Sequence, residues 1–392
     1  MRILISGAGI AGPTLAWWLM RYGFVPTLVE SAPRLRSGGY VIDFWGAGFD
    51  VADRMGLLPE IQRQGYVVRE VRAVASDGRR LAGFRADAFN RALRGRFVSL
   101  PRGDLAATLC RALEGRVETL LGESIDHIEP SAHSVRVAFR SGLTRDFDLV
   151  VGADGLHSRV RQLVFGEQSR FEHYLGCQAA AFSVRGYRPR DELTYLLYGE
   201  VGQQVARFSM RDDRTMFLFT WRDADPALPG SFDDQKNTLR LRFRNSGWEC
   251  PQILDALDGA TDLYYDRVSQ IRMAPQPWHR GRVVLLGDAA SCVSLLAGQG
   301  SALAMVAACI LAGELHRAHG DYAQAFTRYQ QLFGPFVRSK QQAALRMAGF
   351  FAPPSRLYLF LRNRVMNLMS LPGVAALSMG SSLTDTLALP SY

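Results

Sequence analysis

The stretch RILISGAGIAGPTLAWWLMRYGFVPTLVE, residues 2–30, decides the fold. Its start, RILIS, is typical of a short buried strand, and VPTLVE is a second strand that ends at Glu30. Gly7, Gly9 and Gly12 stand between the first strand and an apolar helix, in a G-x-G-x-x-G pattern. This order of strand, glycine loop, helix, strand and acid predicts a Rossmann-type unit that binds a dinucleotide.

Each part of this unit has a chemical reason. Gly7 allows a tight turn, Gly9 lets the backbone approach a pyrophosphate, and Gly12 lets helix and strand pack closely. The helix N-terminus supplies amide donors and a positive dipole, and Glu30 is placed to accept hydrogen bonds from ribose hydroxyls. The glycine loop by itself does not separate NAD from FAD. The cofactor-binding residues expected here are Gly7, Gly9, Ile10, Ala11, Gly12, Glu30 and Ser31.

Two later stretches decide for FAD. Residues 148–161, DLVVGADGLHSRVR, and residues 282–301, RVVLLGDAASCVSLLAGQGS, each run from an apolar strand into an acid and glycines. In a parallel sheet such strand ends meet at the edge where ligands bind. We expect Asp288 to accept from a polyol hydroxyl, and the amides after Gly298 to stabilise negative charge on a reduced flavin ring. The cofactor residues expected here are Asp154, Asp288, Gly298, Gly300 and Ser301.

The three stretches, in this order over residues 1–340, resemble the class A flavoprotein monooxygenases of the para-hydroxybenzoate hydroxylase type. LPRGDL at 100–105 is similar to the R-x-x-L segment of that family, which implies that Arg102 contacts the flavin. RSGGYVIDFWG at 36–46 resembles the small enzymes that inactivate tetracyclines by hydroxylation. By that likeness Arg36 meets the nicotinamide cofactor and Asp43 the flavin.

The resemblance implies non-covalent FAD, NADPH or NADH as co-substrate, and no catalytic side chain or metal of the protein's own. The expected reaction is hydroxylation of a phenol- or enol-bearing aromatic or polyketide-like molecule through a flavin hydroperoxide. The sequence departs from the family at Ser291, Leu295 and Ala302, where His, Pro and Asn are frequent. Two alternatives therefore stay open: an FAD-dependent reductase or dehydrogenase without oxygen insertion, and a non-catalytic protein that binds flavin or a drug.

The expected fold is α/β: an FAD-binding, Rossmann-like parallel-sheet domain, an inserted antiparallel substrate domain, and C-terminal helices. The segments of alternating polarity after residue 173 suit antiparallel strands with one buried face. Arg207 and Arg211 are expected at a solvated strand edge, with contact to an anionic substrate as the alternative. The aromatic residues expected to line a substrate pocket, or else to be core, are Tyr195, Phe208, Phe217 and Phe219. The expected domains are 1–73, 97–172 and 269–340 for FAD, 74–96 and 173–268 for substrate, and 341–392 as a bridging helical segment.

The C-terminal segment, 353–392, is rich in apolar residues such as Leu357, Phe360 and Leu368. Because such side chains need a partner surface, we expect the segment to pack across the substrate entrance, with Pro372-Gly373 as its turn. Its arginines also suit a membrane surface, the minor interpretation.

Composition limits the choice of partners. The chain has 392 residues with a net charge of +9, and five cysteines without a C-x-x-C pair. Scattered arginines without a basic block exclude a nucleic-acid arm. The odd cysteine count favours a reducing compartment and argues against a disulfide framework or a zinc site. We expect a cytoplasmic monomer or weak dimer that binds a small aromatic substrate, without nucleic acid or membrane contact.

Overall fold

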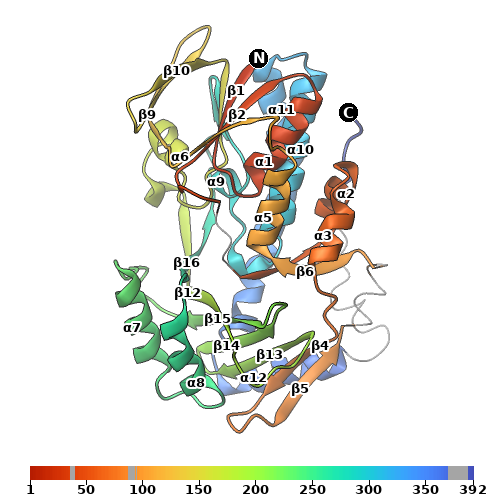
Figure 1. Ribbon diagram of the computed structural model, residues 1–392, viewed down its shortest axis with the longest axis vertical. Helices are drawn as coiled ribbons and strands as arrows, with labels where there is room; N and C mark the ends of the chain where they lie inside the picture. Colours follow the sequence, from red (N-terminus) through yellow and green to blue (C-terminus); the bar gives the residue numbers. More distant parts are fainter. Residues whose placement is uncertain (36–39, 87–92, 94, 370–386) are drawn as a thin grey trace.

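The first strand of the chain, β1 (Arg2–Ser6), lies inside a six-stranded sheet, as the opening stretch predicts. The computed structural model describes residues 1–35, 40–86, 93, 95–369 and 387–392 (Figure 1). Arg36 and the Pro372-Gly373 turn therefore lie outside the described residues. The strand order is β17-β18-β11-β1-β2-β7. The bounds of the other strands are β2 Val25–Glu30, β7 Glu118–Leu121, β11 Leu149–Gly152, β17 His279–Arg280 and β18 Val283–Leu285.

The five strands from β18 to β7 run parallel. Because β11 and β18 follow β1 in register, the loops that leave their carboxyl ends meet at one edge of the sheet. The helix α1 (Ala11–Arg21) connects β1 to β2, packs on α10 (Gly300–Arg317), and buries most of its length. All three sequence stretches that predicted the cofactor site thus converge on this edge.

A seven-stranded sheet forms the second large layer, below the first in Figure 1. Its order is β16-β12-β15-β14-β13-β4-β5, and its pairs are antiparallel except β13 with β4. Its strands are β4 Glu70–Val74, β5 Arg80–Arg85, β12 Glu172–Arg185, β13 Thr194–Glu200, β14 Gln203–Ser209, β15 Arg214–Arg222 and β16 Tyr264–Ile271. The expected α/β class with a separate, largely antiparallel sheet is confirmed. The division into domains at the expected boundaries stays a prediction.

Two smaller sheets complete the strands. The three-stranded one, β10-β9-β8, and the two-stranded one, β3-β6, are antiparallel. Their bounds are β3 Val41–Trp45, β6 Phe97–Pro101, β8 Ile125–Pro130, β9 Val135–Phe139 and β10 Thr144–Phe147. The remaining helices are α2 Ala47–Arg54, α3 Leu58–Gln64, α5 Arg102–Arg111, α6 Arg159–Phe165, α7 Phe232–Phe243, α8 Cys250–Ala256, α9 Asp288–Ser291, α11 Tyr322–Phe351 and α12 Arg356–Leu368.

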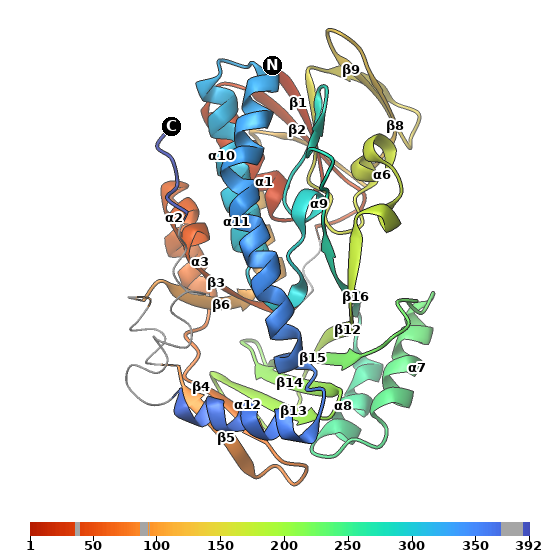
Figure 2. The same ribbon diagram turned by 180° about the vertical axis from the view of Figure 1, so that it is seen from behind.

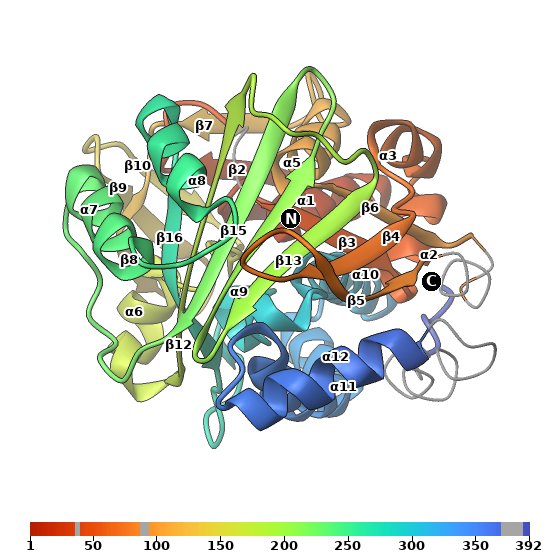
Figure 3. The ribbon, with the colours of Figure 1, turned by 90° about the horizontal axis from the view of Figure 1, so that it is seen from below.

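One helix joins the two large sheets. The 30-residue α11 starts beside α10 and runs down to the seven-stranded sheet, where α12 follows it (Figure 2). On that sheet α7 and α8 cover one face, and α12 lies against the opposite face at the β5 end (Figure 3). Among the described residues, no helix combines the length and the apolarity needed to cross a membrane.

Candidate functional site

The glycine loop after β1 leaves space where a side chain would otherwise stand. A Cβ at Gly7 would approach the Ala153 carbonyl oxygen to 2.5 Å, and a Cβ at Gly12 would approach the Gly7 carbonyl oxygen to 1.9 Å. These two glycines are therefore required by the packing of the protein itself. At Gly9 an added Cβ would meet only the end of the Arg102 side chain, at 3.5 Å. Only the end of a flexible side chain thus stands in front of the Gly9 backbone, which fits the close approach of a phosphate group.

Glu30 ends β2 beside this loop, as predicted. Its carboxylate accepts hydrogen bonds from the Ala8 and Ala32 amides, both at 2.9 Å, and from the Ser31 hydroxyl at 3.2 Å. Ile10 and Ala11 lie buried where α1 begins. These bonds fix the carboxylate next to the glycine loop while leaving lone pairs free, which suits a ribose acceptor.

The third stretch brings Asp288 to the start of α10. Gly287 has a φ of +60°, a conformation that glycine tolerates, and it directs the chain from β18 into α9. A Cβ at Gly300 would lie 3.9 Å from Asp288 Oδ1, so the acid faces the first turn of α10. Burial raises the pKa of the Asp288 carboxyl, and the nearby Arg102 guanidinium opposes that shift. Arg102 thus stands between the glycine loop and Asp288, at the position implied by the family resemblance.

The α10 N-terminus has the expected form. Gly298 is left-handed with a φ of +65°, and Gly300 and Ser301 are the first residues of the 18-residue helix. Successive amides at the start of a helix of this length favour negative charge. The nearest side chain to an added Cβ at Gly298 would be Trp45, at 3.9 Å. The loop therefore lies close to β3, which carries Asp43.

Asp154, by contrast, is held by its own loop. Its carboxylate accepts from the Ser158 hydroxyl, from the Val160 amide at 3.0 Å and from the Ser6 hydroxyl at 3.4 Å. Burial raises its pKa, and the Ser158 hydrogen bond opposes the shift. In this structure Asp154 shapes the turn after β11 and orders the start of α6.

Arg161, in the same stretch, connects the second and third motifs. It is fully buried and donates to the Ala289 carbonyl at 2.9 Å and the Leu156 carbonyl at 2.6 Å. A buried guanidinium that binds two separate loops fixes their relative position. The sequence places Arg161 in the motif but carries no signal for this partner, which lies 128 residues away.

Asp43 lies where the cofactor edge meets the seven-stranded sheet. The Ser99 hydroxyl, across the β3–β6 pair, donates to its carboxylate at 2.5 Å. Burial raises the pKa of Asp43, and this hydrogen bond opposes the shift. Tyr195 of β13 lies next to Asp43 and Ser99. Burial raises the pKa of Tyr195, the Asp43 charge raises this pKa further, and a hydrogen bond with Ser99 opposes the shift. The predicted flavin contact and a predicted pocket residue are thus neighbours.

Two aromatic pairs lie on this face of the seven-stranded sheet, one at β13 and β14 and the other at β16, three strands from β14. Tyr195 stacks on Phe208 with centroids 4.4 Å apart, and Tyr40 meets Tyr264 edge-on at 5.2 Å. Burial raises the pKa of Tyr40 to about 12 and that of Tyr264 well above 10, with Arg102 opposing both shifts. Sequence reasoning missed Tyr40 and Tyr264, because only the fold brings these two strand ends together.

Phe217 and Phe219 do not belong to this group, so the expected pocket of four aromatic residues is wrong for these two. Both are fully buried on the other face of the sheet, where Phe182 and Phe243 pack against them. The reason is the two-residue period of a strand. Met216 and Leu218 of β15 share the face of Phe208 and Tyr195, whereas the alternate residues Phe217 and Phe219 point to α7 and α8.

Arg207 is not at a solvated edge either. β14 is an inner strand of the sheet, and Arg207 is only 1% exposed. Its guanidinium donates to the Asp191 carboxylate and the Pro189 carbonyl and lies 3.4 Å from Glu249. A buried arginine with two acids satisfies its own charge and orders the loop before β13.

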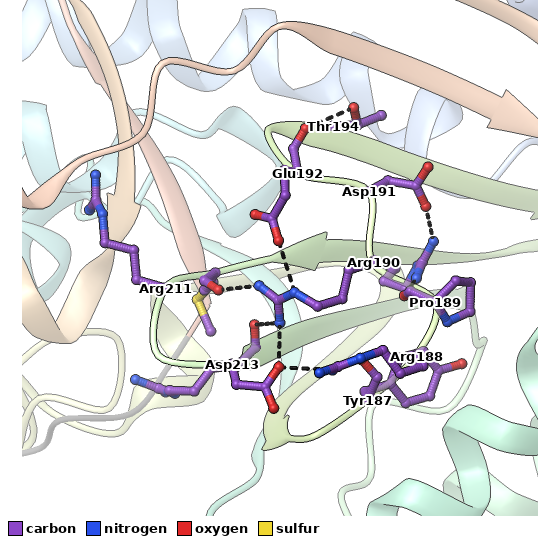
Figure 4. Close-up of polar contacts among 12 residues, drawn as sticks. Tyr187, Arg188, Pro189, Arg190, Asp191, Glu192, Thr194, Arg211 and Asp213 are labelled. Carbon is purple, nitrogen blue, oxygen red and sulfur yellow. Dashed lines mark hydrogen bonds and ion pairs between the residues drawn. The ribbon is translucent and has the colours of Figure 1, made fainter.

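Arg211 fixes the adjoining turn. It donates to the Gln64 and Gly65 carbonyls, so it connects the seven-stranded sheet to α3. Figure 4 shows the loop network beside it, in which Arg190 lies between Glu192, at 2.8 Å, and Asp213, at 3.3 Å. With their donors used internally, neither Arg207 nor Arg211 is available to hold an anionic substrate.

An open hollow of about 840 Å³ lies elsewhere, beside α8, and Arg185, Arg188 and Arg214 are among its lining residues. It is on the side of the sheet away from Tyr195 and Phe208, so it is separate from the aromatic pairs described above. No cluster of three or more metal-ligating side chains occurs among the residues that the structure describes.

Comparison with known proteins agrees with this geometry. The family described as "FAD binding domain" matches residues 1–325. A flavin-dependent monooxygenase from an unknown prokaryotic organism is 36% identical over 351 residues, which cover 87% of this chain and 87% of that protein. A flavin-dependent monooxygenase of Legionella longbeachae is 32% identical and covers 100% of this chain and 98% of its own. The crystal structure of tetracycline destructase Tet(51) superposes with a TM-score of 0.84 at 32% identity, covering 100% and 99% of the two chains. The chain therefore belongs to the FAD-binding-domain family, and it is an FAD-dependent monooxygenase.

Proposed function

We propose that this monooxygenase consumes NADPH or NADH and hydroxylates a phenol- or enol-bearing aromatic or polyketide-like molecule. The observation that carries the proposal is two aromatic pairs on one side of the seven-stranded sheet: Tyr195 with Phe208 beside Asp43, and Tyr40 with Tyr264 beside Arg102 and Asp288. When bound, FAD accepts a hydride and activates dioxygen, chemistry that the side chains cannot supply. Its site, in this proposal, is formed by Gly7, Gly9, Ile10, Ala11, Gly12, Glu30, Ser31, Asp43, Arg102, Asp288, Gly298, Gly300 and Ser301.

The chain's own residues have three tasks in this reaction. The aromatic walls exclude water and offer flat apolar surfaces to an aromatic ring. Burial raises the pKa of Tyr195 and Tyr264, so both hydroxyls stay protonated near neutral pH and are donors for a substrate oxygen. Asp288, opposite the α10 N-terminus, accepts from a hydroxyl of the cofactor.

The similarity to tetracycline destructase Tet(51) supports a fused-ring polyketide as the substrate class, and with it an antibiotic-modifying role. The five cysteines are free thiols, which supports a cytoplasmic location. We further propose that the chain divides into the FAD, substrate and bridging domains expected from the sequence, with Tyr195 and Phe208 as its pocket residues.

The test compares nicotinamide oxidation, oxygen uptake and product in one assay. Purified holoenzyme is mixed with NADPH or NADH and a panel of phenols and tetracyclines. Hydroxylation consumes equimolar nicotinamide, dioxygen and substrate and yields a product heavier by one oxygen atom, with the second oxygen leaving as water. Nicotinamide oxidation with a reduced product and no oxygen incorporation would instead favour the reductase alternative, which the Leu295 and Ala302 departures support.

A further inference from the structure

The helix α12 presents an apolar stripe to solvent. Its outward residues are Leu357, Phe360, Leu361, Val365 and Leu368, each between 50% and 66% exposed. Their spacing of three, one, four and three residues puts them on one face of the helix. The expected packing of this segment on the rest of the chain thus leaves these five side chains without cover. Exposed apolar surface of this kind marks an interaction site more often than chance.

The stripe faces outward because the other side of α12 is fixed. Met366 is buried with Leu197 and Ala206 of the sheet. The Arg362 guanidinium donates to Gln204 Oε1 at 2.7 Å and to the Phe350 carbonyl at 3.0 Å. The helix is thus anchored to the sheet by one face, and rotation that would bury the stripe would break these contacts.

The sequence on both sides of α12 carries charge of one sign. The sequence contains no Asp or Glu between Asp321 and Asp385. Basic residues in the same stretch are Arg328, Arg338, Lys340, Arg346, Arg356, Arg362 and Arg364. On α12, Arg356 is exposed at the border of the stripe. Arg364, four residues after Phe360 and three after Leu361, is exposed within the stripe, and its guanidinium lies 4.9 Å from the Phe360 ring centroid. An apolar stripe with exposed arginines, on a helix without acids, matches a surface that is apolar inside and anionic outside, because a long arginine side chain can reach the headgroups from within the stripe.

We propose that α12 docks on the surface of an anionic lipid bilayer, with Leu357, Phe360, Leu361, Val365 and Leu368 among the acyl chains and Arg356 and Arg364 at the headgroups. This reverses the expectation of no membrane contact. With 13 residues, α12 has the length of a surface-lying helix and not of a spanning one.

A second copy of the chain is a poorer occupant. A two-fold pairing through the stripe brings like surfaces together, and Arg364 lies near the middle of α12. The two Arg364 side chains would then approach each other, and α12 carries no acid to compensate them. A lipid phosphate supplies that negative charge directly.

Docking would also place the substrate-binding face of the sheet close to the lipid. α12 packs on the face of the sheet that carries Ala206 of β14. Phe208, two residues after Ala206 on the same strand, stacks on Tyr195 of β13. Docking would thus bring the bilayer to the side of the sheet that carries the pair of Tyr195 and Phe208, whose role as a substrate wall rests on the proposed function.

The test is co-sedimentation of the full-length, FAD-loaded protein with vesicles. One set of vesicles is phosphatidylcholine, and the other is an equal mixture of phosphatidylcholine and phosphatidylglycerol. We expect binding to the anionic vesicles at low salt, with a steep loss at high salt. Phe360→Ser with Leu361→Ser should weaken binding by about tenfold or more. Arg356→Gln with Arg364→Gln should weaken it by roughly fivefold for each arginine and reduce the salt dependence.

The matched control is Leu241→Ser on α7, a residue 65% exposed on the other side of the sheet. It should bind anionic vesicles like the parent protein. Retained FAD absorbance reports folding, and the arginine variants, which change only exposed charges, guard against misfolding of the serine variants. A parent protein that stays in the supernatant with both vesicles overturns the proposal. So does a dimer, measured by light scattering without lipid, that dissociates in the Phe360→Ser, Leu361→Ser variant.

Discussion

Gly9 and Gly12 stand three residues apart, yet a methyl group at each would meet different surroundings. At Gly12 it would reach a backbone oxygen, whereas at Gly9 it would reach only the flexible end of Arg102. Gly12→Ala should therefore destabilise the protein even without FAD, by about 1–3 kcal/mol. Gly9→Ala should leave the FAD-free protein intact and weaken FAD by about tenfold or more, roughly 1.4 kcal/mol. Thermal unfolding without FAD and fluorescence titration with FAD separate the two effects. Equal loss of stability in both variants would contradict the assignment of Gly9 to the cofactor.

His157 and Asp266 form a bridge whose strength depends on pH. The imidazole Nε2 lies 2.9 Å from the Asp266 carboxylate, and Gln168 bonds the other ring nitrogen. The hydrogen bond to Asp266 raises the pKa of His157, Glu172 adds to the rise, and burial opposes it. Since the folded pKa is above the unfolded value of 6.5, the bridge stabilises fully below that pH. Its contribution is lost as pH rises through the folded pKa.

His157→Gln should consequently lower the melting temperature more at pH 6 than at pH 9. Melting curves of parent and variant across that range measure the difference, with Asp266→Asn as the partner change. In the Asp266→Asn background, His157→Gln should have little further effect. A loss of stability that is the same at every pH would show that the imidazole acts by packing alone.

At the scale of elements, the last residue of the chain closes onto α10. The Tyr392 hydroxyl donates to Glu314 Oε1 at 2.9 Å, and Arg317 of α10 donates to Glu314 and to the Ser391 carbonyl. Glu314 is 2% exposed, so it depends on these donors. Tyr392→Phe should cost about 1.5 kcal/mol, a hydrogen bond to a charged group, and Tyr392→Ala should cost more. Denaturant unfolding of the two variants checks the order, and unchanged midpoints would contradict it.

This contact changes what truncation is expected to do. Since all cofactor motifs lie upstream of Pro353, the sequence favours a protein that keeps FAD without its C-terminal segment. In the structure, truncation at Pro353 also removes Tyr392 and its hydrogen bond to Glu314 of α10. The same helix begins at Gly300, beside the expected cofactor site. Truncation at Pro353 should therefore weaken FAD binding as well, which FAD released on dilution would measure.

Local patterns predicted the elements that carry the cofactor, because the glycine loop, Glu30 and the two strand-acid stretches are each contained in a short segment. The alternation of polar and apolar residues also predicted the strands of the second sheet. A period of two residues defines two faces of a strand, but it does not indicate which face meets the cofactor. Phe217 and Phe208 were therefore indistinguishable. Contacts between residues far apart in the sequence could not be predicted from local patterns either. Arg161 binds the Ala289 carbonyl, and Arg207 pairs with Asp191 and Glu249.

At the scale of the molecule, α11 connects the cofactor edge to the seven-stranded sheet, and Gln341 is a buried hydrogen-bonding residue on this helix. The Gln341 amide donates to the Ile271 carbonyl at 2.8 Å and the Cys292 carbonyl at 3.0 Å. Gln270 donates in turn to the Gln341 and Val293 carbonyls. One buried side chain thus joins the end of β16 to the chain that follows α9, just before the Leu295 loop.

Gln341→Leu should cost about 1–3 kcal/mol, because two buried carbonyls each lose a hydrogen bond. It should also lower the fraction of nicotinamide oxidation that ends in product, since the loop at the α10 N-terminus would lose its anchor and admit water. Gln342→Leu, an exposed neighbour on the same helix, is the matched control and should change neither quantity. Unfolding midpoints give the stability, and the ratio of product to oxidised NADPH gives the coupling. Lower stability with unchanged coupling would show that Gln341 holds the two sheets together without controlling the reaction space between them.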